Sequence, residues 1–311
     1  MSTPAVQGLS GFGLEVPDLE EATAFYTAFG LNSEHRGNVV TLNCPGRDQA
    51  DIVLIKGAVK RLQHVSFFIR PGETDAFADK LKQDGLEVRE DAPGGSERQG
   101  LWFQDPWGTW IHLNPVPARV ADPPADLPSN NYNRADRVDM HLWRELKKDR
   151  PPRRIGHMLL FTQDWEKAEG FFQNTLGLRV SDRVAGKVTF MSAGDGIIDH
   201  HCFGLIPSTH RGFQHASFQV SGYDDIGFGA WRMREAGYKD GFGPGRHALA
   251  SNLFYYARDP WGSWIEYYAD MDKISPDWTS NDFDTLPYIW GPEWSPEFWG
   301  GEMNANLEPA G

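Results

Sequence analysis

The alternation of apolar and polar residues predicts the same order of elements twice along the chain. In each half a short apolar strand is followed by an aspartate, Asp18 or Asp164, at the position of a helix N-cap. The residues after each aspartate then place apolar side chains on one face of a helix, and Gly30 and Gly177 follow as helix stops. The apolar faces comprise Ala22, Phe25, Tyr26 and Phe29 in the first helix and Ala168, Phe171, Phe172 and Leu176 in the second.

Three pairs of similar segments occur in the same order in both halves, which indicates a tandem duplication. The pairs are LSGFGLEV at Leu9 and IGHMLLFT at Ile155, LQHVSFFI at Leu62 and FQHASFQV at Phe213, and DPWGTWIHL at Asp105 and DPWGSWIEY at Asp259. The repeated units span about residues 8–115 and 154–272. Each unit consists of a short strand, an amphipathic helix and several further short strands, so we expect an α+β fold with two homologous domains.

The remaining segments differ from the repeats in composition. Residues 116–153 are rich in proline and form a linker, in which we expect a short helix within 134–148. Residues 273–311 carry four tryptophans, which is too aromatic for a disordered tail. We therefore expect this tail to pack on the second unit or on a partner subunit. The length of 311 residues also agrees with two domains.

Charge and composition exclude several classes of partner. The net charge of −13 argues against nucleic acid and anionic membrane as partners. The chain lacks an apolar run of about 18 residues and a secretion signal at its start, so we expect neither membrane insertion nor export. Its two cysteines do not suggest a disulfide framework. We expect a cytoplasmic protein.

Comparison of the two units singles out a set of metal ligands. Three equivalent strand positions in the second unit are His157, His215 and Glu266. The same positions in the first unit are Gly11, His64 and His112. Two imidazoles and one carboxylate form the facial triad of non-haem Fe(II) oxygenases. A single strand histidine is ordinarily a hydrogen-bonded core residue, so the prediction depends on the three together. The first unit, with glycine in place of one ligand, is expected to be a metal-free structural copy.

Around these residues the sequence resembles the type I extradiol dioxygenases of the vicinal oxygen chelate superfamily, over about residues 8–272. The motifs are IGHMLLF, FQHASFQV and WIEYY around the three ligands, together with IDHHCFGL and FGPGRHALASNLFYYARDP. In the last motif Tyr256 follows His247 by nine residues, and Glu266 follows Tyr256 by ten, as in the family pattern. The resemblance implies tandem pairs of βαβββ modules, with the metal inside the second pair.

The resemblance also implies a reaction and roles for residues. The expected reaction inserts both atoms of O2 into a catechol-type diol with meta ring cleavage, in aromatic compound degradation. Fe(II) is the expected metal, with Mn(II) as the alternative, and a homo-oligomer is expected. His201 is expected to be the catalytic proton donor, and His247 and Tyr256 are expected to bind the substrate oxygen. The remaining residues that we place near the substrate are Phe190, Leu159 and His200.

Several alternatives remain at this stage. Phe190 and Leu159 could be plain core, and strand alternation would turn His200 away from the iron if His201 faces it. The same superfamily contains glyoxalase-like isomerases and small-molecule-binding resistance proteins. An isomerase usually has an acidic ligand where one histidine stands here, and a binding protein does not need His201, His247 and Tyr256. Hydroxyphenylpyruvate dioxygenase has a similar triad but lacks the spacing from His247 to Tyr256.

Overall fold

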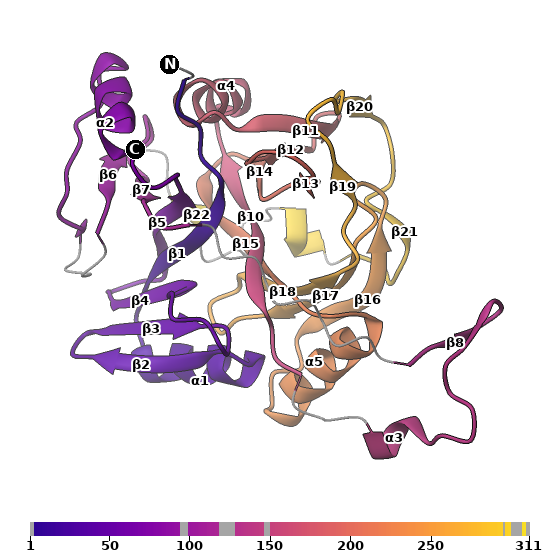
Figure 1. Cartoon of the computed structure of the whole chain (residues 1–311). Helices are drawn as coiled ribbons and strands as arrows, with labels where there is room; N and C mark the ends of the chain where they lie inside the picture. The colour runs from indigo at the N-terminus through magenta and orange to yellow at the C-terminus, as the bar shows by residue number, and fades with distance from the viewer. Residues whose placement is uncertain are drawn as a thin grey trace.

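The computed structural model describes residues 3–93, 99–117, 128–145, 150–294, 296–299 and 307–308. Each half contains two β-α-β-β-β units, which confirms the predicted α+β fold (Figure 1). In the unit around α2, the strand after the helix consists of the bridge between Arg89 and Trp102. None of the described helices is both long and apolar enough to cross a bilayer.

The first half forms a seven-stranded sheet with the order β2-β3-β4-β1-β5-β7-β6. In this sheet β1 pairs parallel to β4 and antiparallel to β5, and β5 pairs parallel to β7. The elements are β1 (Gly8–Val16), α1 (Leu19–Phe29), β2 (Asn32–Arg36), β3 (Val39–Asn43), β4 (Ile52–Lys56), β5 (Arg61–Phe68), α2 (Thr74–Gln83), β6 (Leu101–Gln104) and β7 (Trp110–Asn114).

The second half repeats this arrangement in a larger sheet, with the order β20-β11-β12-β14-β10-β15-β18-β17-β16-β21 and β22 paired to β15. A separate pair of strands joins β13 and β19. The elements of the repeat are β10 (Arg154–Thr162), α4 (Trp165–Leu176), β11 (Arg179–Val184), β12 (Val188–Ser192), β13 (Ile198–Asp199), β14 (Phe203–Pro207), β15 (Arg211–Gln219), α5 (Tyr223–Glu235), β16 (Gly241–His247), β17 (Leu253–Arg258) and β18 (Trp264–Ala269).

The first helix of each half forms as its sequence predicts. The Asp18 carboxylate caps α1 by accepting hydrogen bonds from the N–H groups of Glu20 and Glu21, at 2.9 and 3.0 Å. Gly30 and Gly177 end α1 and α4 with φ of 110° and 73°, a left-handed conformation that glycine adopts without steric cost. The predicted positions that are buried comprise Ala22, Phe25, Tyr26, Phe29, Ala168, Phe172 and Leu176.

Two details of α4 differ from the prediction. Asp164 occupies the N-cap position but makes no capping hydrogen bond. Its carboxylate instead accepts a hydrogen bond from Trp107 Nε1 of the first half, at 3.4 Å. Phe171 is only half-buried, because it lies toward the edge of the helix face and packs against Trp107.

The sequence pattern did not reveal the second helix of each half, α2 and α5. The pattern is weak in α5 because Gly227 and Gly229 lie inside the helix and lower its intrinsic propensity. Gly229 is nevertheless required, because an added Cβ would lie 2.7 Å from the ring of Tyr267. In α2 only Phe77 and Leu81 are buried, which is a short signal against a polar background.

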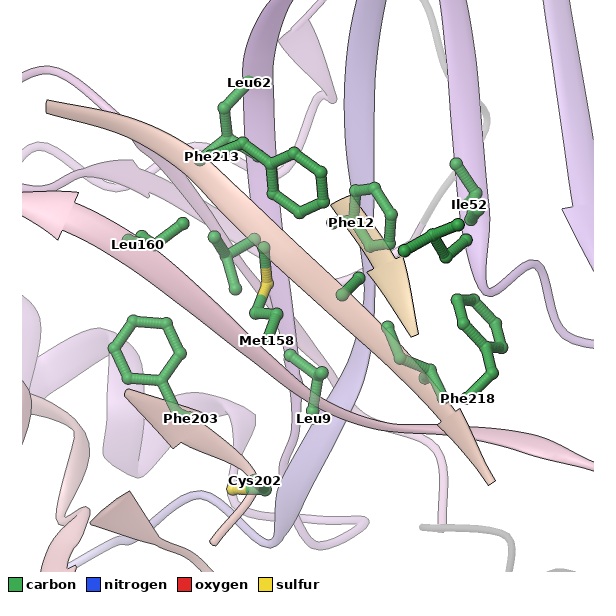
Figure 2. Packing of buried hydrophobic residues seen from close by; sticks show 14 of the residues in the cluster. Leu9, Phe12, Ile52, Leu62, Met158, Leu160, Cys202, Phe203, Phe213 and Phe218 are labelled. Carbon is green, nitrogen blue, oxygen red and sulfur yellow. The ribbon is translucent and has the colours of Figure 1, made fainter. Parts of the chain in front are cut away.

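The two halves share one continuous hydrophobic core. Figure 2 shows Phe12 of β1 beside Phe213 of β15, and their ring centroids lie 5.1 Å apart. Phe29 at the end of α1 stacks on Tyr267 of β18 at 3.9 Å, and the Tyr267 hydroxyl donates a hydrogen bond to the Phe29 carbonyl. The first half therefore supports the back of the sheet that carries the predicted ligands.

Buried charges join the halves in a reciprocal way. Lys60, which precedes β5, forms a buried ion pair with Asp259 in the DPWG turn of the second half. Arg211, at the equivalent position of the second half, lies near Asp105 in the DPWG turn of the first. Burial raises the pKa of Asp105 to about 6, against the opposing effects of backbone hydrogen bonds from Thr109 and Trp107 and of the Arg211 charge. Each repeated turn is thus contacted by a basic residue of the other half.

The linker stands out from the body as a separate arm (Figure 1). It contains the hairpin β8 (Asn130–Asn131) and β9 (Arg134–Ala135) and the short helix α3 (Leu142–Glu145). The helix expected within 134–148 is present only at residues 142–145, and the prediction is wrong for residues 134–141. Residues 146–149 lie outside the described residues. Tyr132 and Trp143 of this arm are 100% and 74% exposed.

The tail packs on the second half, as expected. Its described elements are β19 (Lys273–Ile274), β20 (Asp282–Phe283), β21 (Tyr288–Trp290), the 3-10 helix η2 (Pro296–Trp299) and β22 (Leu307–Glu308). These strands extend the second half by pairing with β13, β11, β16 and β15. Phe298 of η2 is buried and packs with Phe254, Tyr256 and Trp264 of the same sheet.

Candidate active site

Three neighbouring strands bring the predicted ligands together. His157 lies on β10, His215 on β15 and Glu266 on β18, and Ser217 is the register partner of both His157 and Glu266. One ligand atom of each of the three residues lies within 4.8 Å of the others. All three side chains are buried. The triad inferred from the repeat is therefore a compact cluster in the folded chain.

A hydrogen-bond chain from the tail orients His215. The Gln214 side chain donates from Nε2 to the carbonyl of Phe298, at 3.0 Å, and its Oε1 accepts from Nδ1 of His215. This contact fixes the His215 tautomer, because the proton must be on Nδ1. Nε2 of His215 is then free of a proton and faces Glu266 Oε2, at 3.7 Å, without a hydrogen-bond partner.

Glu266 accepts hydrogen bonds on both carboxylate oxygens. Oε2 accepts from the Ser217 hydroxyl and from His157 Nε2, the latter at 3.1 Å, and Oε1 accepts from the side-chain amide of Asn252, at 3.4 Å. Burial alone would raise the pKa of Glu266, but the hydrogen bond with His157 is the largest opposing effect, and the pKa lies below its ordinary value. Burial lowers the pKa of His215 to about 3. The cluster therefore presents neutral His215 beside an ionised carboxylate.

These properties fit a divalent metal ion. Nε2 of His215, which faces the Glu266 carboxylate, is buried without a hydrogen-bond partner, and this is costly unless something else binds it. Histidine nitrogen and carboxylate oxygen are ligands that iron and manganese accept. Within the described residues no other group of three such side chains comes as close together.

The first half keeps the framework of this cluster without its ligands. Ser66 pairs with both Gly11 and His112, as Ser217 pairs with His157 and Glu266. A Cβ added to Gly11 would lie 2.5 Å from the backbone oxygen of Asp51, so no side chain fits there. The His112 ring contacts Ser66 Oγ and the Gln99 carbonyl, both at 3.0 Å, so both of its nitrogens already have partners.

A cavity opens beside the cluster of His157, His215 and Glu266. Its wall includes two of the cluster residues, His157 and His215, together with His201, His247 and Tyr256. Leu159 and Phe190 also line it, so the structure places both where the sequence reasoning expected them. Further apolar residues of the wall comprise Val184, Val188, Ile206, Leu249, Leu286 and Pro287, and the polar residues Lys187, Asn252 and Thr285 also line it.

His201 faces the cavity and His200 does not, which corrects the assignment of His200 to substrate binding. The His201 ring lies 4.5 Å from the rings of both His157 and Phe190. His200 turns to the opposite side, where its Nε2 lies 2.8 Å from Asp182 Oδ2. Burial, followed by the neighbouring histidines, holds the pKa of His201 well below its ordinary value.

His247 and Tyr256 form a pair at the cavity wall. The His247 Nδ1 donates to the carbonyl of Pro287 in the tail, at 3.2 Å, which leaves Nε2 as an acceptor when the ring is neutral. The Tyr256 hydroxyl lies 3.2 Å from this Nε2 and donates to it. Burial, and then the nearby Glu266 carboxylate, raise the pKa of Tyr256 well above its ordinary value. Tyr256 is therefore a neutral hydrogen-bond donor.

The tail closes one side of the cavity with aromatic residues. Phe298 packs against His215 at 5.8 Å and against Tyr256 at 4.9 Å. Trp294 packs against Phe298 at 4.4 Å and against His247 at 5.7 Å. The tail thus contacts one predicted ligand and both residues of the His247–Tyr256 pair.

Among the residues that sequence reasoning missed, Gln214, Ser217 and Asp182 help to hold the site together. The first two could have been found, because QHxS occurs in both repeats, at residues 63–66 and 214–217. Asp182 has no such signal, since it lies on β11 and meets His200 only in the folded chain.

Comparison with known proteins agrees with this geometry. The family model described as Glyoxalase/Bleomycin resistance protein/Dioxygenase superfamily matches residues 154–267. Over 297 residues the chain is 36% identical to Metapyrocatechase 2 of Cupriavidus necator, covering 93% of this chain and 90% of that protein.

Solved structures share the fold across nearly the whole chain. The Mn(II)-bound glyoxalase from Novosphingobium aromaticivorans superposes with a TM-score of 0.78 at 22% identity, covering 99% of both chains. Homoprotocatechuate 2,3-dioxygenase from Arthrobacter globiformis superposes with a TM-score of 0.76 at 19% identity, covering 99% of this chain and 97% of that one. At these identities the two structures are evidence for the fold alone.

Proposed function

The chain belongs to the extradiol dioxygenases of the glyoxalase and dioxygenase superfamily, and we propose that it opens its catechol at the His157–His215–Glu266 cluster. The reaction class is meta ring cleavage with insertion of both atoms of O2, in the degradation of aromatic compounds. The observation that carries the assignment to this site is the buried cluster of two imidazoles and one carboxylate beside an aromatic-lined cavity.

Bound at this cluster, Fe(II), or Mn(II) as the alternative, would bind the catechol and O2 and supply the redox chemistry between them. His157, His215 and Glu266 would hold the ion. Gln214 supports this role because it keeps the proton of His215 on Nδ1 and so leaves Nε2 available as a ligand. Such orienting partners typically change metal affinity by about 10–100-fold.

His201 would carry the proton that the reaction moves. It lines the cavity, and its ring adjoins that of His157. A neutral imidazole must accept a proton before it can donate one. We therefore propose that His201 first takes a proton from a substrate hydroxyl and later returns it to a departing oxygen.

His247 and Tyr256 would hold the substrate oxygen. Tyr256 is a neutral donor at the cavity wall, and the Pro287 carbonyl fixes the orientation of His247. A catechol oxygen that enters between them could accept the Tyr256 hydrogen bond in place of His247 Nε2. Both residues would then orient the ring for reaction.

The remaining cavity wall favours a substrate without charge on its substituent. Leu159, Val184, Val188 and Ile206 contact the same space as Phe190, so this side of the cavity is apolar. An ionised carboxylate placed there would lose its hydration. Lys187 is the one lysine or arginine that lines this cavity among the described residues, and its side chain is exposed to solvent rather than enclosed with these apolar groups. We therefore propose a catechol with an alkyl or aryl substituent as the substrate class.

We also propose that the enzyme is a homo-oligomer in the cytoplasm. The arm around β8 and α3 exposes Tyr132, Val138 and Trp143, which is unusual for aromatic and β-branched side chains on a free surface. A second copy of the chain would cover them. Light scattering after size exclusion tests this, and a monomer of the wild-type chain would contradict it.

The function is tested by anaerobic loading with Fe(II), followed by addition of O2 and a panel of catechols. We expect a yellow ring-opened product, one O2 consumed per catechol, and both oxygen atoms of labelled O2 in that product. Alkyl- and aryl-substituted catechols should react with higher kcat/KM than carboxylated ones. Failure to cleave any catechol after iron uptake would contradict the proposal.

A further inference from the structure

Behind the cavity wall, Asp182, His200 and His201 form a continuous hydrogen-bonded chain. Nδ1 of His200 lies 3.1 Å from Nδ1 of His201, and Nε2 of His200 lies 2.8 Å from Asp182 Oδ2. All three side chains are buried. Nδ1 of His201 is occupied by its contact with His200, so Nε2 is the nitrogen that His201 has available for a substrate in the cavity.

The chain has a defined direction of proton donation. A carboxylate only accepts hydrogen bonds, so the Nε2 of His200 must carry a proton and donate it to Asp182. With His200 neutral, its Nδ1 then has no proton and must accept a hydrogen bond. The donor of that hydrogen bond is Nδ1 of His201, which therefore carries the proton. This leaves the Nε2 of His201 as a bare acceptor toward the cavity.

We propose that Asp182 and His200 are positioning residues that fix the tautomer of His201, so that its Nε2 is ready to accept the substrate proton. The proposal rests on the proposed function for its catalytic consequence, but the tautomer itself does not depend on the reaction. When Nε2 of His201 takes up a proton, the imidazolium is hydrogen-bonded through His200 to the negative charge of Asp182. This resembles how an aspartate orients and stabilises a catalytic histidine in hydrolases.

The surroundings of Asp182 make this orientation rigid. Its second oxygen, Oδ1, accepts from the backbone N–H of Asn281 in the tail, at 2.8 Å. The backbone of His200 is also held on both sides, since its N–H donates to Asp272 and its carbonyl accepts from Ser181. Rotation of the Asp182 carboxylate to exchange its two oxygens would therefore break its contact with the backbone of Asn281.

This anchoring gives Asp182→Asn a distinctive expected effect. The amide oxygen of the new side chain would stay on the N–H of Asn281, because only an oxygen can accept that bond. Its NH2 group would then face Nε2 of His200 as a donor. His200 would have to carry its proton on Nδ1 and donate to His201, which would move the His201 proton to Nε2. The substitution thus reverses the direction of proton donation along the three hydrogen-bonded side chains. It hardly changes the volume of the side chain at position 182.

The direct test is the tautomer of His201, read from imidazole ¹⁵N chemical shifts and ¹⁵N–¹H couplings of the full-length chain. The protein is loaded with Zn²⁺, which is diamagnetic and has no redox chemistry. The His201 signals are assigned by their loss in His201→Gln. We expect protonation at Nδ1 in the wild type and at Nε2 in Asp182→Asn. A doubly protonated His200, or His201 protonated at Nε2 in the wild type, would overturn the proposal.

The kinetic test uses the iron-loaded enzyme and compares three substitutions. Asp182→Asn and His200→Leu should lower kcat by about 10- to 100-fold, with the KM for catechol and the iron content unchanged. His200→Gln should recover most of the loss, because an amide can accept from His201 and donate to Asp182 at the same time. Asp225→Asn, a substitution at another buried aspartate of the second half, serves as the matched control and should keep kcat.

The tautomer measurement and the kinetic measurement together distinguish failure of this proposal from failure of the proposed function. If the wild type cleaves no catechol, the function is wrong, and the tautomer measurement on the zinc protein still decides the present proposal. If the wild type is active but Asp182→Asn keeps both the wild-type kcat and the wild-type tautomer, the positioning role is wrong. Equal losses of kcat in His200→Leu and His200→Gln would also contradict it.

Discussion

Gly11 and His157 occupy equivalent places in the two halves, since each pairs across its sheet with the serine of the repeated QHxS segment. The two halves nevertheless differ at this position in more than the side chain. The backbone oxygen of Asp51 occupies the space that a side chain at position 11 would need. The first half has therefore lost both a ligand and the room for one.

It follows that the chain should bind one metal ion. Elemental analysis of the iron-loaded protein after removal of loosely bound metal should give one equivalent per chain. Substituting Gly11→His should not add a second equivalent, because the added side chain meets the Asp51 backbone. Two equivalents in the wild type would contradict the assignment of the first half as metal-free.

Removing a ligand should abolish iron retention and turnover while the chain stays folded. His215→Ala and Glu266→Ala each remove one of the three predicted metal ligands. The metal affinity should therefore fall by more than the roughly 10–100-fold that is typical when an orienting partner of a ligand is removed. His64→Ala is the matched control, because His64 makes the same contact with its preceding glutamine in the first half. Iron content and circular dichroism check this, and full iron in either ligand variant would refute the triad.

His201 and His200 should differ sharply in their kinetic effect. His201→Gln should still bind iron and catechol but lose about 100-fold or more in turnover, the scale of a lost proton-transfer group. His200→Gln should cost much less, since its amide can replace both hydrogen bonds of the ring. Single-turnover kinetics with pre-bound catechol and a pulse of O2 measures the step. A larger loss in His200→Gln would mean that the wrong histidine has been placed in the cavity.

The tail should be required for both iron retention and turnover. A chain ending at Ile274 lacks Phe298 and its contact with Gln214, and with it the support of His215. We expect at least about a 10-fold loss of metal affinity, as for other partners of metal ligands. Phe298→Ala should show part of the loss, whereas Ile289→Ala, at a 62% exposed position of the tail, should not. Unchanged kinetics of the shortened chain would argue against this role.

The buried ion pair between the halves should matter for stability. Lys60→Met leaves the Asp259 carboxylate buried without its cationic partner, and breaking such pairs costs about 3–5 kcal/mol. Thermal unfolding should therefore show a large decrease in Tm with little change in kcat at low temperature. Lys80→Met breaks only the pair with Asp84 at the surface, which is worth about 0–1 kcal/mol, and its Tm should barely change.

The repeat made much of this site predictable from the sequence. Aligning the two units separates His157, His215 and Glu266 from the other histidines and acids, and the fold then places them on adjacent strands. The helix faces and the glycine stops followed from local spacing alone. These features are short-range, or are duplicated, and so leave a trace in the sequence.

Other features arise only from contacts between distant segments. The partner of His200 is Asp182, on a different strand, and the partner of Lys60 is Asp259, in the other half. Neither pair has a characteristic spacing, so the sequence could not reveal it. The placement of His200 was ambiguous for a related reason, since the direction of two adjacent side chains depends on the backbone register.

The contact from Phe298 through Gln214 to His215 also bears on the order of events during synthesis. Glu266 is the last of the three ligands along the chain, and Phe298 is translated after it. All three ligands are therefore synthesised before the segment that orients His215. A nascent chain would hold the metal weakly until this segment folds back onto β15. Loading with iron is then expected to be a late event, completed after the strands themselves have paired.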